Sequence, residues 1–165
     1  DRRRNRLPDS ASSGYIDSFS DELSLALGRA VWAFSAIELI TNDYLRQLST
    51  EPLHELMAGQ SFRVRTRLVA QLLARIDSFP REKADATRYL KRAEGLAEIR
   101  NAIAHNPWQV WADFDLRELR AQIKPVRANS EGQTLESVRK FTAEAQEVAT
   151  GLSQALRMLP YICNG

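Results

Sequence analysis

The sequence contains little cysteine, glycine or proline. Its single cysteine, Cys163, has no partner for a disulfide or for a cysteine-based zinc site. Seven glycines and six prolines among 165 residues are few for the many turns of a β-sandwich or barrel, whereas residues that favour helices are common. An apolar content of 44% is enough for a buried core. These proportions predict one all-α domain.

Long apolar runs and several well-known motifs are also missing. No uninterrupted apolar run approaches the roughly 18 residues that span a bilayer, and no N-terminal hydrophobic segment resembles a signal peptide. We therefore expect a cytoplasmic protein that does not enter a membrane. The patterns GxxxxGK[ST], GxGxxG and GxSxG do not occur, which leaves nucleotide hydrolysis, Rossmann chemistry and serine hydrolysis without support.

The positive charge is almost entirely arginine, since only four of the 23 basic residues are lysines. A guanidinium forks onto a phosphate, but a genome rich in arginine codons gives the same composition. The net charge of +2 is too small to indicate nucleic acid by itself. Residues 1–16 contain RRRNR and then several serines, and we expect a flexible basic tail there, which leaves 17–165 as the helical domain.

Apolar residues recur at helical spacing in four long segments. These segments cover about 18–48, 53–79 with a break at Gly59, 81–105 and 134–160. In the second segment the apolar stripe runs through Val64, Leu68, Leu72, Leu73 and Ile76. The last helix is expected to open at Thr134, with Glu136 and Ser137 in its first turn. The third must end near His105, because Pro107 disfavours the helical conformation at Asn106. Four such helices predict an antiparallel bundle. Residues 108–127 alternate between polar and apolar, so we expect a short hairpin between the third and last helices, with a helical turn over LRELRAQI as the alternative.

The stretch EIRNAIAHNPW, residues 98–108, places three polar side chains near the end of an otherwise apolar helix. Asn101 and His105 are four residues apart and therefore share a face, with Arg100 on the neighbouring ridge. An unpaired Arg that faces the core is costly. Arg100 therefore needs a carboxylate, a phosphate or a water-filled cleft, and Glu38 on the inward side of the first helix is a candidate carboxylate.

Residue chemistry alone leaves two interpretations of this stretch. In the first, the helix dipole favours His105 in the last turn and Arg100 pairs with a buried Glu, so both side chains are structural. In the second, they form a site, and the small neighbours Ala97 and Ala104 leave room for a phosphate or a second helix to approach.

The string from Arg100 to His105, RNAIAH, resembles the RNxxxH signature of the HEPN superfamily, the helical domains named for higher eukaryotes and prokaryotes nucleotide-binding. The layout is also similar to that family: an early helix with an acidic residue, here Glu38, then the motif near the end of a later helix, and then a closing helix. The helical pattern is similar from about residue 18 to 160, and its specific part is the six-residue motif.

This resemblance implies a metal-independent endoribonuclease of the toxin–antitoxin or phage-defence type, which acts as a homodimer on single-stranded RNA or tRNA. His105 would transfer protons and Arg100 would bind the phosphate. Asn101 would position His105 or the scissile phosphate, and Glu38 would orient Arg100. It implies no metal or cofactor, and an antitoxin protein is a candidate partner. Some family members carry a modifiable Tyr two residues after the His, and Pro107 stands there in this chain.

Further alternatives stay open at this point. Trp108 and Trp111 are candidates for stacking on RNA bases, or they pack a hairpin onto the bundle. His54 is the second histidine of the chain, and because position 58 is Ala it forms no HExxH zinc motif, so we expect a surface or loop residue. The main alternative function is a non-catalytic HEPN-like module that binds RNA, a nucleotide or a protein partner. The third is a helical dimerisation domain without a ligand.

Overall fold

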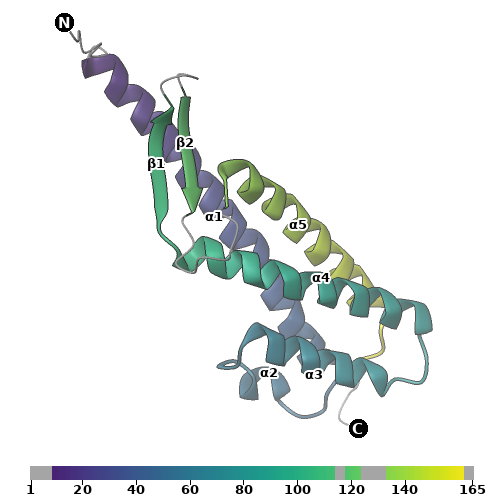
Figure 1. Ribbon diagram of the computed structural model, residues 1–165. Helices are drawn as coiled ribbons and strands as arrows, with labels where there is room; N and C mark the ends of the chain where they lie inside the picture. The colour runs from purple at the N-terminus through teal and green to yellow at the C-terminus, as the bar shows by residue number, and fades with distance from the viewer. Residues whose placement is uncertain (1–8, 114–117, 124–132, 162–165) are drawn as a thin grey trace, which may run out of the picture.

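The computed structural model describes residues 9–113, 118–123 and 133–161, which are mostly helical with one small sheet (Figure 1). The helices are α1 (Asp9–Gln47), α2 (Leu53–Leu56), α3 (Phe62–Ala74), α4 (Pro80–His105) and α5 (Leu135–Met158), and the strands are β1 (Trp108–Asp113) and β2 (Glu118–Ile123). The predicted helix-dominated class and the predicted hairpin are confirmed. Cys163 and residues 1–8 lie outside the described residues.

One hydrophobic core is shared by α1, α3, α4 and α5. Its centre contains Phe34, whose ring meets Phe62 edge-on at 5.2 Å between centroids and stacks near Phe141 at 6.3 Å. Tyr44 is also fully buried, and burial raises the pKa of its hydroxyl above the ordinary value. That hydroxyl donates a 2.9 Å hydrogen bond to the carbonyl of Leu152, so the polar end of the ring is satisfied.

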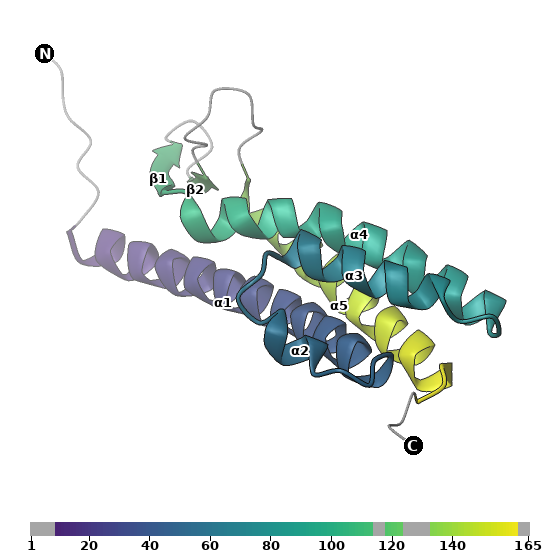
Figure 2. The ribbon, with the colours of Figure 1, turned by 90° about the horizontal axis from the view of Figure 1, so that it is seen from below.

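Helices α1 and α5 run in the same direction. Glu22 in the first half of α1 pairs with Arg139 near the start of α5, and Tyr44 near the end of α1 bonds to Leu152 in the second half of α5. The prediction of an antiparallel bundle is therefore wrong for this pair. Figure 2 shows the two helices side by side along the molecule.

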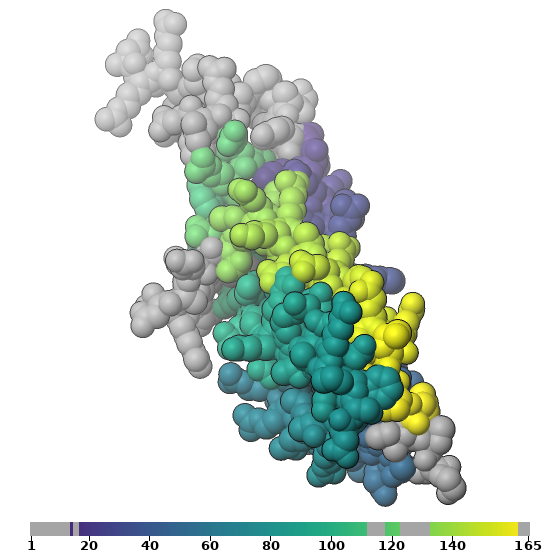
Figure 3. Space-filling view, turned by 90° about the vertical axis from the view of Figure 1, so that its right-hand side faces the viewer, coloured from purple at the N-terminus to yellow at the C-terminus, as the bar shows by residue number. Residues whose placement is uncertain are grey.

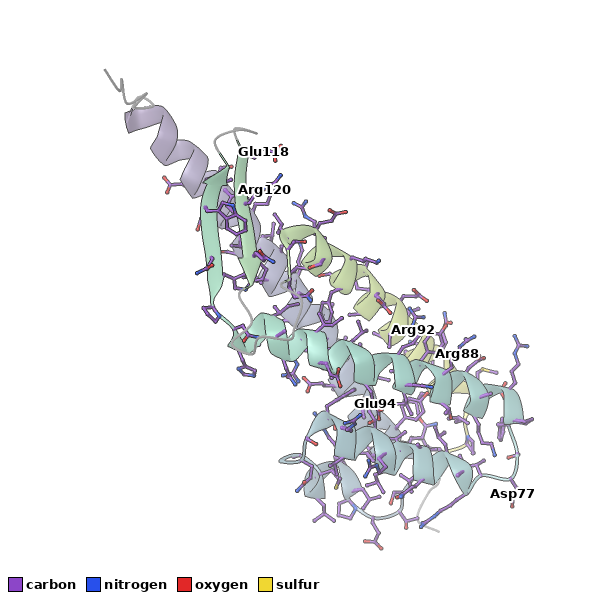
Figure 4. All side chains as sticks on the ribbon, in the orientation of Figure 1. Asp77, Arg88, Arg92, Glu94, Glu118 and Arg120 are labelled. Atoms are coloured by element: carbon purple, nitrogen blue, oxygen red, sulfur yellow. The ribbon has the colours of Figure 1, made fainter. Side chains whose placement is uncertain are left out.

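Helix α4 runs opposite to α5, and Figure 3 shows the two next to each other on one face of the molecule. Arg92 donates to both oxygens of Glu147, at 2.6 and 3.1 Å, and to Glu144 at 3.4 Å. Figure 4 shows Arg88 and Arg92 on the side of α4 that faces α5. The hydrogen bond from Arg92 holds the pKa of Glu147 below its usual value and raises the pKa of Arg92.

The direction of α3 explains why the bundle is not simply antiparallel. Residues 48–61, which include α2, carry the chain back along α1, so that Phe62 at the start of α3 packs against Phe34 in the second half of α1. From there α3 runs alongside α1 in the same direction, and Arg65 reaches Glu38 and Asn42. Helix α4 is therefore antiparallel to α1, α3 and α5, which are parallel to one another.

Local chemistry fixes two of the helix starts. Thr134 caps α5 as predicted: its hydroxyl accepts from the Ser137 backbone N–H, and the Ser137 hydroxyl accepts from the Thr134 backbone N–H. Pro80 opens α4 in the first-turn position that suits proline. By contrast, α1 begins at Asp9, so residues 9–16 are helical where a tail was predicted. Each residue added to an existing helix gains a hydrogen bond, which favours this extension.

The segment Asp17–Gln47 of α1 is long and apolar enough, by length and composition, to cross a membrane. Its most apolar 18-residue window has a mean hydropathy of 1.5, and 33% of that window is buried against the rest of the chain. The expectation that no segment could span a membrane considered only uninterrupted apolar runs, and it therefore missed the high mean hydropathy of this window. The core helix of a soluble protein meets the same criterion, so the finding does not assign the helix to a membrane.

The hairpin follows directly from the end of α4. Strands β1 and β2 pair antiparallel, with Trp108 opposite Ile123 and Trp111 opposite Arg120. Gln122 also forms an isolated bridge with Thr134, which connects the hairpin to the start of α5.

Gly151 on α5 gives a test of the packing between α4 and α5. A Cβ atom at this position would lie 2.2 Å from the ring of Tyr89, whereas one at Gly95 would meet nothing within 4 Å. Alanine favours both helices over glycine. We therefore predict that Gly151→Ala lowers the free energy of unfolding, relative to Gly95→Ala, by about 1–3 kcal/mol, the usual cost of overpacking.

Urea denaturation of both variants measures this difference. In a Tyr89→Ala background the extra cost of Gly151→Ala should disappear, because the clashing ring is gone. Equal stability of Gly151→Ala and Gly95→Ala in the wild-type background would contradict this packing.

Candidate functional site

The end of α4 is defined by the residues that follow the motif. Asn106 is the C-cap, with the extended backbone (φ −105°, ψ 146°) expected before Pro107. Its side-chain amide donates to the Ala102 carbonyl at 2.9 Å, and its backbone N–H donates to the same oxygen at 3.2 Å. The predicted end of the helix at His105 is confirmed.

The motif side chains divide between the inside and the outside of the bundle. Arg100 is half-buried and turns toward α1, whereas Asn101 and His105 are exposed. The helical spacing that places Asn101 and His105 on one face therefore leaves both open to a ligand or a second protein. Arg100 and His105 are five residues apart, which is about 7.5 Å along the helix axis.

Arg100 is held by one carboxylate and one aromatic ring. Its Nη2 donates to Oε1 of Glu38 at 3.0 Å, which is the pairing that the sequence suggested. Its guanidinium carbon lies 4.9 Å from the centroid of the Phe34 ring, a cation–π contact. Its Nε is buried and has no hydrogen-bond partner among the described residues. The guanidinium is therefore fixed from the α1 side.

A second guanidinium, which the sequence analysis did not single out, shares the same oxygen. Arg65 on α3 donates through Nη2 to Oε1 of Glu38 at 3.0 Å and through Nη1 to Oδ1 of Asn42 at 3.1 Å. Glu38 thus joins three helices, because α1 carries the carboxylate while α3 and α4 each carry a cation. One carboxylate between two guanidiniums leaves this cluster, Glu38–Arg65–Arg100, with one net positive charge.

A signal in the sequence could have identified Arg65. The buried face of α3 runs through Phe62, Arg65, Thr66 and Val69, so Arg65 occupies a core position at helical spacing. The apolar stripe predicted for this segment ran through Val64 instead, and Val64 is exposed. A charged residue at a core position needs a partner of opposite charge, and Glu38 provides it.

The neighbouring contact between α3 and α4 is also polar. The hydroxyl of Thr66 donates to Glu94 at 2.6 Å, and Figure 4 shows Glu94 on the side of α4 that faces α3. The carboxylate of Glu94 therefore accepts a hydrogen bond from a neutral hydroxyl, whereas that of Glu38 accepts from the charged side chains of Arg65 and Arg100.

The two tryptophans occupy different environments. Trp108 is half-buried and packs against the core, as expected of a residue that fixes the hairpin to the bundle. Its Nε1 is buried without a hydrogen-bond partner in the described part of the chain. Trp111 is 42% exposed on the hairpin. A role of either ring in RNA binding stays a prediction.

An apolar groove lies beside the motif. It has a volume of about 870 Å³ and is bounded by α1, the end of α4 and the start of β1. Its lining comprises Leu27, Gly28, Val31, Trp32, Ser35, Ala36, Leu39, Ile103, Ala104, Asn106 and Trp108. Trp32 is 81% exposed and Leu39 is 61% exposed. Large apolar side chains that stay exposed together are typical of an interaction surface.

Metal-binding chemistry finds no support in the described residues, which hold no group of three or more His, Cys, Asp or Glu side chains that could bind an ion. His54 lies in α2 with its side chain 24% exposed, 3.7 Å from Glu55, and not in a loop as one alternative had it. Its Nδ1 is buried and has no hydrogen-bond partner among the described residues.

No protein-family model matches the chain, and the searches of curated proteins and of solved structures give no significant match. The resemblance to the HEPN superfamily therefore depends on the motif residues and on their placement in this structure.

The cluster predicts a stability cost for loss of Glu38. Glu38→Ala removes the acceptor of two charged hydrogen bonds and leaves the buried Arg65 beside Arg100. We expect the free energy of unfolding to fall by about 1.5–3 kcal/mol, the usual cost of losing a partner of a charged group. Asp43→Ala, which breaks an exposed pair with Arg46 on the same helix, should cost at most about 0.5 kcal/mol.

Chemical denaturation measures the free energy of unfolding of the Glu38→Ala and Asp43→Ala variants and so checks the predicted difference. Equal losses for Glu38→Ala and Asp43→Ala would contradict a stabilising cluster.

Proposed function

We propose that this chain is a metal-independent endoribonuclease of the HEPN toxin or phage-defence type, with a composite site formed by two copies of the motif helix. The observation that carries the proposal is the division of the motif: Arg100 is fixed by Glu38 and Phe34, while Asn101 and His105 are exposed at the same helix end. A fixed cation beside exposed proton-transfer and amide groups suits a phosphodiester substrate.

The chemistry uses RNA's own 2′-hydroxyl. A base removes the proton of that hydroxyl, its oxygen attacks the adjacent phosphorus, and the bond from phosphorus to the 5′-oxygen breaks as an acid protonates that oxygen. The products are a 2′,3′-cyclic phosphate and a 5′-hydroxyl. Histidine suits both proton transfers because its unperturbed pKa is about 6.5. Arg100 would stabilise the charge that develops on the phosphate.

Two histidines are needed for separate acid and base roles, and one chain supplies one motif histidine, His105. A two-fold dimer would place two copies of His105 and two of Arg100 in one cleft. The apolar groove beside the motif supports this arrangement, because a second copy seated there would cover Trp32 and Leu39 and would bring its own motif helix near the first.

The remaining parts of the proposal concern fold and context. The shared core of α1, α3, α4 and α5 supports a HEPN-like four-helix domain in which α4 opposes the other three helices. The substrate would be single-stranded RNA or a tRNA loop in the cytoplasm, and an antitoxin protein is a candidate partner. No metal or cofactor takes part in the proposed reaction.

One observation favours the alternative of a non-catalytic HEPN-like module. Arg100 is only 24% exposed at its side chain and already has a carboxylate partner, so the motif would then be a packing network that presents Asn101 and His105 to RNA, a nucleotide or a protein. This module would bind without turnover.

Replacement of His105 distinguishes the two functions. We predict that the wild-type protein cleaves a mixed RNA pool in excess EDTA and leaves 2′,3′-cyclic phosphate ends. His105→Ala should reduce cleavage by at least about 10²-fold, the usual contribution of a general acid or base. Because His105 is exposed, the variant should keep its helical content.

His54→Ala is the matched control, since it removes the other histidine from a different part of the chain. It should cleave RNA at close to the wild-type rate. Activity of His105→Ala equal to that of wild type, or RNA binding by a folded wild type without cleavage, would contradict the nuclease and favour the binding module.

The dimer gives a separate prediction. Trp32→Glu places a charge in the proposed interface, where burial of an unpaired charge is costly, so the variant should be monomeric in analytical ultracentrifugation and inactive on RNA. Met158→Glu alters a residue on α5 that is 62% exposed and does not line the groove, and it should remain dimeric. A Trp32→Glu variant that stays dimeric would exclude this groove as the interface.

A further inference from the structure

Arg65 is the least exposed charged residue of the site region. The residue is 8% exposed, and its guanidinium bonds to Glu38 and Asn42. We propose that Arg65 is a positioning residue that balances the charge of Glu38, so that the Glu38–Arg65–Arg100 cluster presents a net positive charge to a phosphate bound at Arg100. The inference rests on the proposed function and deepens it, because it assigns a role to a residue outside the RNxxxH motif.

Burial excludes direct contact between Arg65 and RNA. The side chain is 10% exposed and lies over the Phe62 ring, with its guanidinium carbon 5.7 Å from the ring centroid. A guanidinium this buried can influence a bound substrate only through the side chains that it contacts. Arg65 therefore acts through Glu38, which is the one residue in the described part of the chain that hydrogen-bonds to both guanidiniums.

The charges of the cluster show why a second cation matters. Arg100 and Glu38 alone form a neutral pair, which would give an approaching phosphate a weak attraction. Arg65 adds a positive charge to the same carboxylate oxygen, and the cluster as a whole becomes a cation. Because these groups are half-buried or buried, water screens their charges less than it screens exposed ones.

The hydrogen-bond pattern agrees with a balancing role. Both Nη2 atoms lie 3.0 Å from the same Oε1 atom, so the two guanidiniums share one acceptor. Asn42 holds the other terminal nitrogen of Arg65 at 3.1 Å with a neutral amide. A neutral second partner fixes Arg65 without cancelling its charge.

A charge-restoring double variant tests the inference. Arg65→Gln leaves the cluster neutral, whereas Arg65→Gln combined with Glu38→Gln returns it to one positive charge and keeps an amide oxygen that accepts from Arg100. Binding of a 2′-O-methyl RNA, which has phosphates but no nucleophile, is measured by fluorescence anisotropy at two salt concentrations. Values of kcat/KM are measured on unmodified RNA, and circular dichroism monitors folding.

We expect Arg65→Gln to weaken binding and to lower kcat/KM by about ten- to a hundredfold, the range found for residues that support direct ligands at metal sites. The double variant should recover most of this loss. Arg65→Lys, which keeps the charge, should retain more activity than Arg65→Gln. Arg81→Gln, which removes an exposed arginine at the opposite end of α4, should have little effect.

The possible results separate this inference from the proposed function. A folded Arg65→Gln with wild-type binding and cleavage, or a double variant no better than the single one, would overturn the inference while the nuclease stands. A wild type that neither binds nor cleaves RNA would overturn both. If Arg65→Gln alone does not fold, the double variant is compared directly with wild type: near-wild-type affinity supports the inference, and a large loss overturns it.

Discussion

The shared carboxylate oxygen of Glu38 is the interaction on which the rest of the site depends. It receives one guanidinium from α3 and one from α4, and it thereby ties both helices to α1. A buried guanidinium without a carboxylate would be costly, so the buried Arg65 depends on Glu38 for its charge partner. The same oxygen fixes where Arg100 points and how much of its charge remains for a ligand. Stability and the proposed phosphate binding thus have a common origin in this structure.

The second constraint is the abrupt end of α4. Pro107 forces an extended backbone at Asn106, so His105 lies in the last turn and is not covered by a further turn of helix. The hairpin then turns away, and the groove between α1 and α4 keeps apolar side chains such as Trp32 exposed. An exposed histidine beside an uncovered apolar groove is the combination that leads us to a dimeric site, since one additional copy would cover the groove and complete the chemistry.

Local sequence signals predicted much of this arrangement. Proline and capping residues marked the end of α4 and the start of α5, and helical periodicity placed Glu38 on the inward side of α1, where it contacts Arg100. Arg65 was missed because a charged residue interrupts an apolar stripe, and the stripe was traced through Val64 instead. The direction of α3 was missed because it depends on how residues 48–61 fold back on α1, a tertiary effect without a local signal. The proposed chemistry came from the resemblance of the RNAIAH string to the HEPN motif, since composition and periodicity carry no signal for a reaction.

The concentration dependence of RNA cleavage tests the central claim most directly, because it joins the nuclease to the composite site in one experiment. Specific activity in EDTA is measured across the concentration range in which sedimentation shows dimers separating into monomers. If two copies of the motif helix form the site, activity per chain should fall in parallel with the dimer fraction. Activity per chain that stays constant while the protein becomes monomeric would contradict the composite site, and no cleavage at any concentration would contradict the nuclease itself.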